Sequence, residues 1–166
     1  MILEYEMRHG ATAPTRANPS DAGLDVYYWP TDPSVSVVRI KPNARATLAT
    51  GLSFGIPHGY MLQVCNRSSM GAKKSLIVGA HIIDSGYDGE VFVDLHNIGQ
   101  EVQLICRGDK IAQLVMVPVI HFRAKQTTHG LYREPITISD RGPGALGSTD
   151  KSKLDNTLND MPVGGF

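Results

Sequence analysis

The fold class is decided by residues 82–96, which read IIDSGYDGEVFVDLH. Val91, Val93 and Leu95 recur with period two, which predicts a strand that buries one face. An acid, a glycine and an aromatic residue precede them and follow an apolar pair, which predicts a tight β-hairpin. Asp84 lies in an apolar run, so its carboxylate has to meet water or a partner, or bond its own backbone.

The same short-strand rhythm extends outward from this stretch. Residues 60–65 (YMLQVC) alternate, whereas residues 111–120 (IAQLVMVPVI) are more continuously apolar and predict a strand buried on both sides. Residues 69–75 offer only a weak helical turn. Turn signals recur about every 8–12 residues, which indicates an all-β sandwich or barrel. They are Asn18-Pro19, Asp32-Pro33, Lys41-Pro42-Asn43, Pro57-His58-Gly59, Asp88-Gly89 and Arg107-Gly108-Asp109.

The composition changes after Ser139. Residues 1–139 have the apolar content of one β domain, while residues 140–166 are rich in Gly, Ser, Asp, Asn and Lys. The second segment cannot bury enough surface to offset its ordering entropy. It is either a disordered tail or an arm that becomes ordered on a ligand.

Composition excludes several classes of protein. The 166 residues carry 16 basic and 16 acidic side chains, which argues against a general nucleic-acid or membrane-surface binder. Cys65 and Cys106 are far apart and the six histidines are scattered, so we expect two reduced, partly buried thiols and no zinc site. No signal peptide and no membrane-spanning run is visible, which predicts a cytoplasmic protein, or one of the host cytoplasm if the source is viral.

Four further segments have the chemistry of a ligand site, and each also has a plain structural interpretation. Residues 20–26 (SDAGLDV) place an acid at a strand start, as an ordinary turn also would. Residues 66–71 (NRSSMG) gather a guanidinium and hydroxyls, which suit phosphate oxygens or begin a short helix. Residues 107–114 (RGDKIAQL) put Gln113 in an apolar run, either bonded to backbone or contacting a ligand. Residues 141–149 (RGPGALGST) offer amides and hydroxyls to phosphate, without P-loop spacing.

Together these five segments, in this order and at these separations, resemble the five motifs of the trimeric dUTPase family. The resemblance covers roughly residues 20–150 and is tightest from Arg67 to Asn97. It implies an all-β, distorted jelly roll (β-clip) that forms a homotrimer with a mobile C-terminal arm. It also implies that each active site uses motifs from all three subunits and hydrolyses dUTP to dUMP and pyrophosphate.

The resemblance implies roles for the central segment. Asp84 is similar to the residue that activates the attacking water, and Tyr87 to the ring that packs against deoxyribose and excludes a 2′-hydroxyl. The backbone around residues 81–87, which includes His81 and Ile83, would read the edge of uracil.

The other motifs are similar to phosphate and metal ligands of the family. Asp25 resembles the acid that holds Mg²⁺ through water, the ion being carried mainly by the triphosphate. The implied phosphate ligands, with Leu146 as the cover over the base, are Arg67, Ser68, Ser69, Gln113, Arg141, Gly147, Ser148 and Thr149.

The sequence departs from the family at several positions. Asn66 stands where proline is usual, so we expect a less rigid strand end, and Leu146 replaces the usual aromatic residue. His81 replaces a usual glycine and would crowd the site if the position needed a positive φ or close contact with uracil. Asp150 replaces a final glycine. These changes would affect how tightly the C-terminal arm closes over the site, and the KM, rather than the reaction itself.

Two other functions compete. A dCTP deaminase shares the fold and an Arg-Ser-Ser motif, but the run from Asp84 to Tyr87 favours a dUTPase. A nucleotide-gated regulatory role, with an unknown protein partner, is the second. The expected partners are therefore dUTP and further copies of the chain, with no nucleic acid and no membrane.

Overall fold

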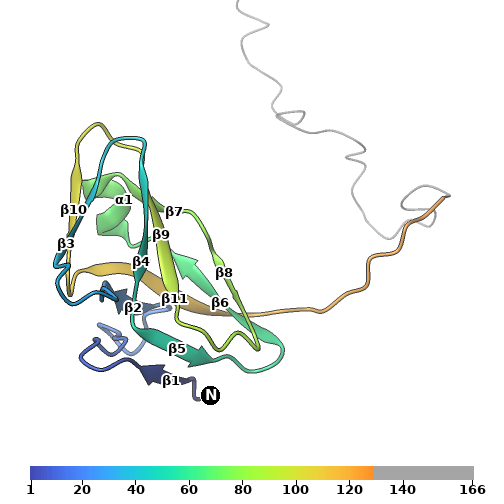
Figure 1. Ribbon diagram of the computed structural model, residues 1–166. Coiled ribbons are helices and arrows are strands. Elements are labelled where there is room, and N and C mark those ends of the chain that lie inside the picture. The colour runs from blue at the N-terminus through green and yellow to red at the C-terminus, as the bar shows by residue number, and fades with distance from the viewer. Residues whose placement is uncertain (129–166) are drawn as a thin grey trace, which may run out of the picture. The chain divides into compact units, whose positions relative to one another are not determined.

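The computed structural model describes residues 1–128, and strands dominate them (Figure 1). The all-β prediction is confirmed by this architecture. The strands are β1 (Glu4–Met7), β2 (Leu24–Tyr27), β3 (Val37–Ile40), β4 (Arg45–Ala49), β5 (Leu52–Gly55), β6 (Tyr60–Cys65), β7 (Leu76–Val78), β8 (Ile82–Asp84), β9 (Phe92–Asn97), β10 (Gln103–Cys106) and β11 (Lys110–Pro118), and the one helix in this part of the chain is α1 (Ser68–Lys74).

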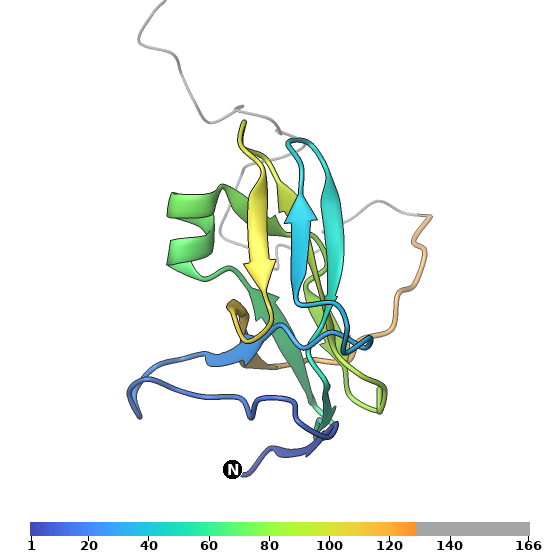
Figure 2. The same ribbon diagram turned by 60° about the vertical axis from the view of Figure 1, so that its left-hand side comes forward.

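Four sheets organise the strands of residues 1–128, and the strand pairs within them are antiparallel. A four-stranded sheet has the order β2-β11-β6-β8, and a three-stranded sheet has the order β4-β9-β7. The pairs β1-β5 and β3-β10 form two smaller sheets, and Figure 2 shows β3 and β10 side by side near α1. Many neighbours in these sheets are distant in sequence, as in a jelly roll.

The core is filled by the alternate residues that the pattern predicted. Val91, Val93 and Leu95 are at most 2% exposed, and in β6 the buried residues are Leu62 and Val64. The predicted strand over residues 60–65 matches the bounds of β6. Burying these aliphatic side chains supplies the hydrophobic stabilisation of the domain.

The predicted tight β-hairpin is wrong in its pairing. β8 pairs with β6, whereas β9 pairs with β4 and β7, so residues 85–91 connect two different sheets. The turn itself is present, since the amide of Tyr87 donates to the carbonyl of Asp84 at 3.3 Å. Period two identifies the buried face of a strand but not its partner.

The prediction that residues 111–120 are buried on both sides is only partly correct. Ile111, Ala112 and Leu114 are buried, but the strand ends at Pro118 and its second half is half-exposed.

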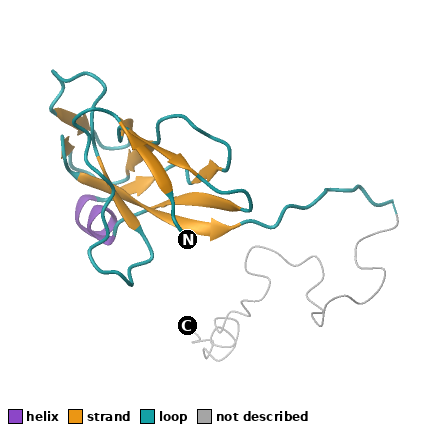
Figure 3. Cartoon of the chain, turned by 90° about the horizontal axis from the view of Figure 1, so that it is seen from below, coloured by secondary structure: helices purple, strands orange, loops and turns teal. Residues whose placement is uncertain are grey.

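Helix α1 is short and is shown in purple in Figure 3. It buries Met70 and ends where Ser75 adopts a left-handed conformation with φ of 51°. The weak helical turn predicted over residues 69–75 corresponds to it. Within residues 1–128, no helix has the length and apolar character needed to cross a membrane.

Met1–Phe122 form one compact unit. The predicted domain boundary at residue 139 lies outside the described residues. Both cysteines are free, and Cys65 is half-buried as expected, but Cys106 is exposed, contrary to the expectation of partial burial.

Candidate active site

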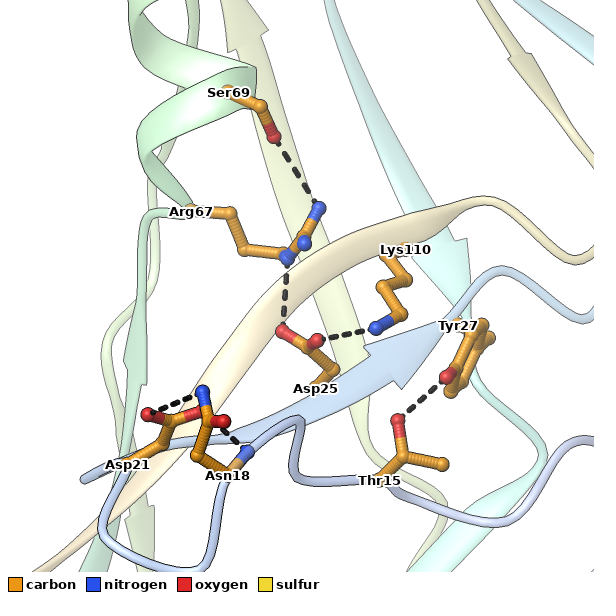
Figure 4. A network of polar contacts seen from close by, with 8 residues as sticks. All are labelled: Thr15, Asn18, Asp21, Asp25, Tyr27, Arg67, Ser69 and Lys110. Atoms are coloured by element: carbon orange, nitrogen blue, oxygen red, sulfur yellow. Dashed lines mark hydrogen bonds and ion pairs between the residues drawn. The ribbon is translucent and has the colours of Figure 1, made fainter.

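An ion-pair network joins three of the predicted segments (Figure 4). Asp25 lies on β2, Arg67 is the N-cap residue of α1, and Lys110 begins β11. Arg67 Nε donates to Asp25 Oδ1 at 2.8 Å, and Lys110 Nζ donates to Asp25 Oδ2 at 2.7 Å. Arg67 also donates through Nη1 to the hydroxyl of Ser69 at 3.3 Å. The carboxylate therefore fixes the guanidinium beside the hydroxyl-rich start of α1.

The electrostatics of the network favour full ionisation. Burial alone would raise the pKa of Asp25, but the hydrogen bonds from Lys110 and Arg67 outweigh it and hold that pKa below its ordinary value. The hydrogen bond to Asp25 raises the pKa of Lys110. With one carboxylate set against two cations, the cluster is positive overall, which suits an anionic ligand.

Strand register explains why these distant residues meet. Gln113 on β11 lies opposite Asp25 on one side and opposite Cys65 on the other. Its Nε2 donates to the carbonyl of Asn66 at 2.8 Å, which is the backbone-bonded alternative left open by the sequence. Gly23 provides the space, because a Cβ there would lie 2.4 Å from Gln113 Oε1.

A second group of site residues surrounds the turn after β8. Asp84 and Tyr87 are exposed and line a pocket of about 260 Å³ together with Ile83. Tyr87 donates its hydroxyl to the carbonyl of Glu90 at 2.8 Å, which fixes the ring. Gly89 allows this, since a Cβ there would lie 2.6 Å from the hydroxyl oxygen.

The two groups lie at opposite ends of β6. Asp84 is paired with Met61 near the start of that strand, and Arg67 follows its last residue, Cys65. The four residue steps of extended chain from Met61 to Cys65 span about 13 Å. One chain thus keeps its predicted water-activating carboxylate far from its predicted phosphate-binding arginine.

His81 has an ordinary backbone conformation. It is not among the described non-glycine residues with positive φ, which are Asn43 and Ser75. Its ring contacts the end of β6, where Nδ1 lies 2.9 Å from the carbonyl oxygen of Val64. The crowding considered from the sequence on grounds of φ therefore does not arise.

Three contacts at the site were not predicted. They are the ion pair of Lys110, the packing of its ammonium 5.7 Å from the Tyr27 ring centroid, and the side-chain bond of Asn66. The sequence carries a signal for the ion pair of Lys110, namely a lysine directly after a turn. This signal can be used only when the register of β11 against the acid-bearing strand β2 is known. The predicted ligands Arg141, Leu146, Gly147, Ser148 and Thr149 lie outside the described residues.

The dUTPase family profile matches residues 9–149. This chain belongs to the dUTPase family. A deoxyuridine 5′-triphosphate nucleotidohydrolase of Anaplasma marginale is 35% identical over 150 residues, covering 89% of this chain and 95% of that one.

Solved structures of the family have the same fold. The dUTPase of Staphylococcus bacteriophage 80alpha, as a point mutant with dUpNHpp, aligns with a TM-score of 0.71 and 25% identity over 89% of this chain and 98% of that chain. A mutant dUTPase from phage phi11 of S. aureus, described as coordinating a structural Mg(II) ion, aligns with a TM-score of 0.67 and 25% identity over 79% of this chain and 99% of that chain. The predicted dUTPase-like fold is thereby confirmed.

Proposed function

We propose that this protein is an enzyme that hydrolyses dUTP to dUMP and pyrophosphate. The observation that carries the proposal is the family match, which spans all five sequence motifs. The match also favours this activity over the dCTP deaminase alternative. The cytoplasm is the location we expect for it.

Asp84 is the proposed general base. Its carboxylate is exposed at the end of β8 and can accept a proton from a water molecule. The water oxygen forms a bond to the α-phosphorus while the bond from that phosphorus to the bridging oxygen breaks. Pyrophosphate leaves with the electron pair of the broken bond.

Recognition of the nucleoside is assigned to β8 and Tyr87. β8 is the last strand of its sheet, so backbone groups on one edge remain available to the acceptor–donor–acceptor pattern of uracil. Cytosine would leave some of these groups unpaired. The ring of Tyr87, held by its hydroxyl bond to the carbonyl of Glu90, would pack against deoxyribose and exclude a 2′-hydroxyl.

Phosphate binding is assigned to the cluster at the other end of β6. Arg67, Ser68 and Ser69 supply donors there, and Gln113 lies beside them. The Mg²⁺ ion is proposed to be carried mainly by the triphosphate. Asp25 can reach Mg²⁺ through water, since each carboxylate oxygen has a second lone pair. The bound ion would neutralise phosphate charge.

We further propose a homotrimer whose sites lie between subunits. The separation of Asp84 and Arg67 along β6 supports it, because one bound triphosphate has to meet both. The half-exposed Val115 and Val117 of β11 support it as well, since another subunit can cover them.

The test is pyrophosphate release from dUTP with Mg²⁺, beside UTP, dCTP and dTTP. Asp84→Asn should lower kcat by about 10²–10⁴-fold because the general base is lost. Asp88→Asn, in the same exposed turn, is the matched control and should keep its activity. Ammonia release from dCTP, or no turnover of dUTP by the wild type, would overturn the proposal.

A further inference from the structure

The segment between β7 and β8 crosses from the three-stranded to the four-stranded sheet. Residues 79–81 make this crossing close to β9. The amide of Gly79 donates to the carbonyl of Asp94 at 2.8 Å, and a Cβ on Gly79 would lie 2.3 Å from His96 Nε2. The crossing therefore has little room, and its path determines where β8 and Asp84 begin.

Asn66 holds the start of the crossing. Its Oδ1 accepts a hydrogen bond from the amide of Val78 at 2.7 Å, and its carbonyl accepts one from Gln113 at 2.8 Å. Asn66 directly precedes Arg67 in the chain. One residue thus links β7 and β11 to the backbone that carries the guanidinium.

His81 holds the end of the crossing. The amide of Val64 donates to the carbonyl of His81 at 2.8 Å, and His81 Nδ1 lies 2.9 Å from the carbonyl oxygen of Val64. Because a carbonyl can only accept, Nδ1 carries a proton and donates. The imidazole thereby takes the place of the second backbone bond of a regular antiparallel pair.

We infer that Asn66 and His81 form a two-point clamp, defined by these two side chains, that fixes Arg67 relative to Asp84. Both are positioning residues, since they act through the backbone beside the groups proposed to contact substrate. Proline or glycine at the two positions could make neither side-chain bond. The catalytic consequence rests on the proposed function, but the clamp itself is a property of the fold. In a trimer with shared sites, it would connect two neighbouring sites.

Amide hydrogen exchange on the full chain tests the clamp independently of enzymatic activity. Asn66→Ala and His81→Ala should each speed exchange at both the Val64 and the Val78 amide, by about tenfold, the equivalent of one hydrogen bond. His81→Asn keeps a donor near the position of Nδ1 and should restore slow exchange. His9→Ala, on an exposed histidine, is the control. If Asn66→Ala speeds exchange only at the Val78 amide, and His81→Ala only at the Val64 amide, the two bonds are independent and the clamp is disproved.

Steady-state kinetics then tests the consequence for catalysis. Each alanine variant should lower kcat and raise KM for dUTP, with kcat/KM falling about three- to tenfold. The double variant should lose little more than the worse single one, because both side chains hold one segment. Losses that multiply, or unchanged kinetics beside faster exchange, overturn the positioning role. If the wild-type chain does not turn over dUTP, the proposed function is wrong instead. The amide hydrogen exchange experiment still decides whether the clamp exists.

Discussion

Asp84 and Arg67 stand at opposite ends of strand β6, with Asp84 paired to Met61 and Arg67 following Cys65. Subunit mixing should therefore restore activity. Asp84→Asn and Arg67→Ala should each be nearly inactive alone. When the two are unfolded together and reassembled at equal amounts, about one quarter of the sites should combine an intact Asp84 with an intact Arg67 from another chain.

The measurement is dUTP hydrolysis before and after reassembly, with the oligomeric mass determined by light scattering. Each variant reassembled by itself is the control. If the mixture stays as inactive as the separate variants while trimers form, both residues serve one site from one chain, and the shared site is wrong.

The ion pairs of Asp25 predict a pH-dependent contribution to stability. Because its pKa is lowered in the folded chain, the stabilisation is present above the unfolded value of about 3.9 and disappears as pH falls through the folded value. Asp25→Asn should lower the free energy of unfolding by about 1–2 kcal/mol at pH 7, since Arg67 and Lys110 lose their counter-ion. Urea unfolding between pH 7 and pH 3 measures the difference.

The two proteins should begin to converge in stability as pH falls below the unfolded value of about 3.9, and the difference should disappear as pH falls through the lowered pKa of the folded carboxyl. Asp21→Asn is a matched control, since Asp21 bonds only to Asn18 in an exposed turn. A deficit of Asp25→Asn that stays constant down to pH 3 would show that packing, rather than charge, is responsible.

The sequence determined faces of strands better than their partners. The alternation in residues 60–65 matched the bounds of β6, and that of Val91, Val93 and Leu95 identified a buried face correctly, because burial on one face imposes period two. The same pattern could not reveal that β8 pairs with β6 rather than with β9, since pairing depends on contacts distant in the chain. The ion pair of Lys110 with Asp25 was inaccessible for the same reason. It joins residues 85 positions apart and exists only once β11 lies beside β2.

Tyr87 allows a test of sugar selectivity. Its ring is held by the bond from its hydroxyl to the carbonyl of Glu90. Tyr87→Ala should reduce the ratio of kcat/KM for dUTP over UTP at least about tenfold, because the surface that excludes the 2′-hydroxyl is gone. Tyr87→Phe keeps the ring and should retain most of the ratio. Equal selectivity of the alanine variant and the wild type would assign the discrimination to another residue.

The same substitution, glycine to alanine, should have opposite effects on stability at two positions. A Cβ on Gly23 would lie 2.4 Å from Gln113 Oε1 and 3.0 Å from its Cβ, whereas a Cβ on Gly71 in α1 meets nothing within 4 Å. Gly23→Ala should therefore displace the Gln113 side chain, break its bond to Asn66 and lower the free energy of unfolding by about 1–3 kcal/mol. Gly71→Ala should raise it by about 0.5–1 kcal/mol, because alanine loses less backbone entropy in a helix. Urea unfolding of both variants measures these changes, and a Gly23→Ala protein as stable as the wild type would mean that Gln113 does not occupy this position in solution.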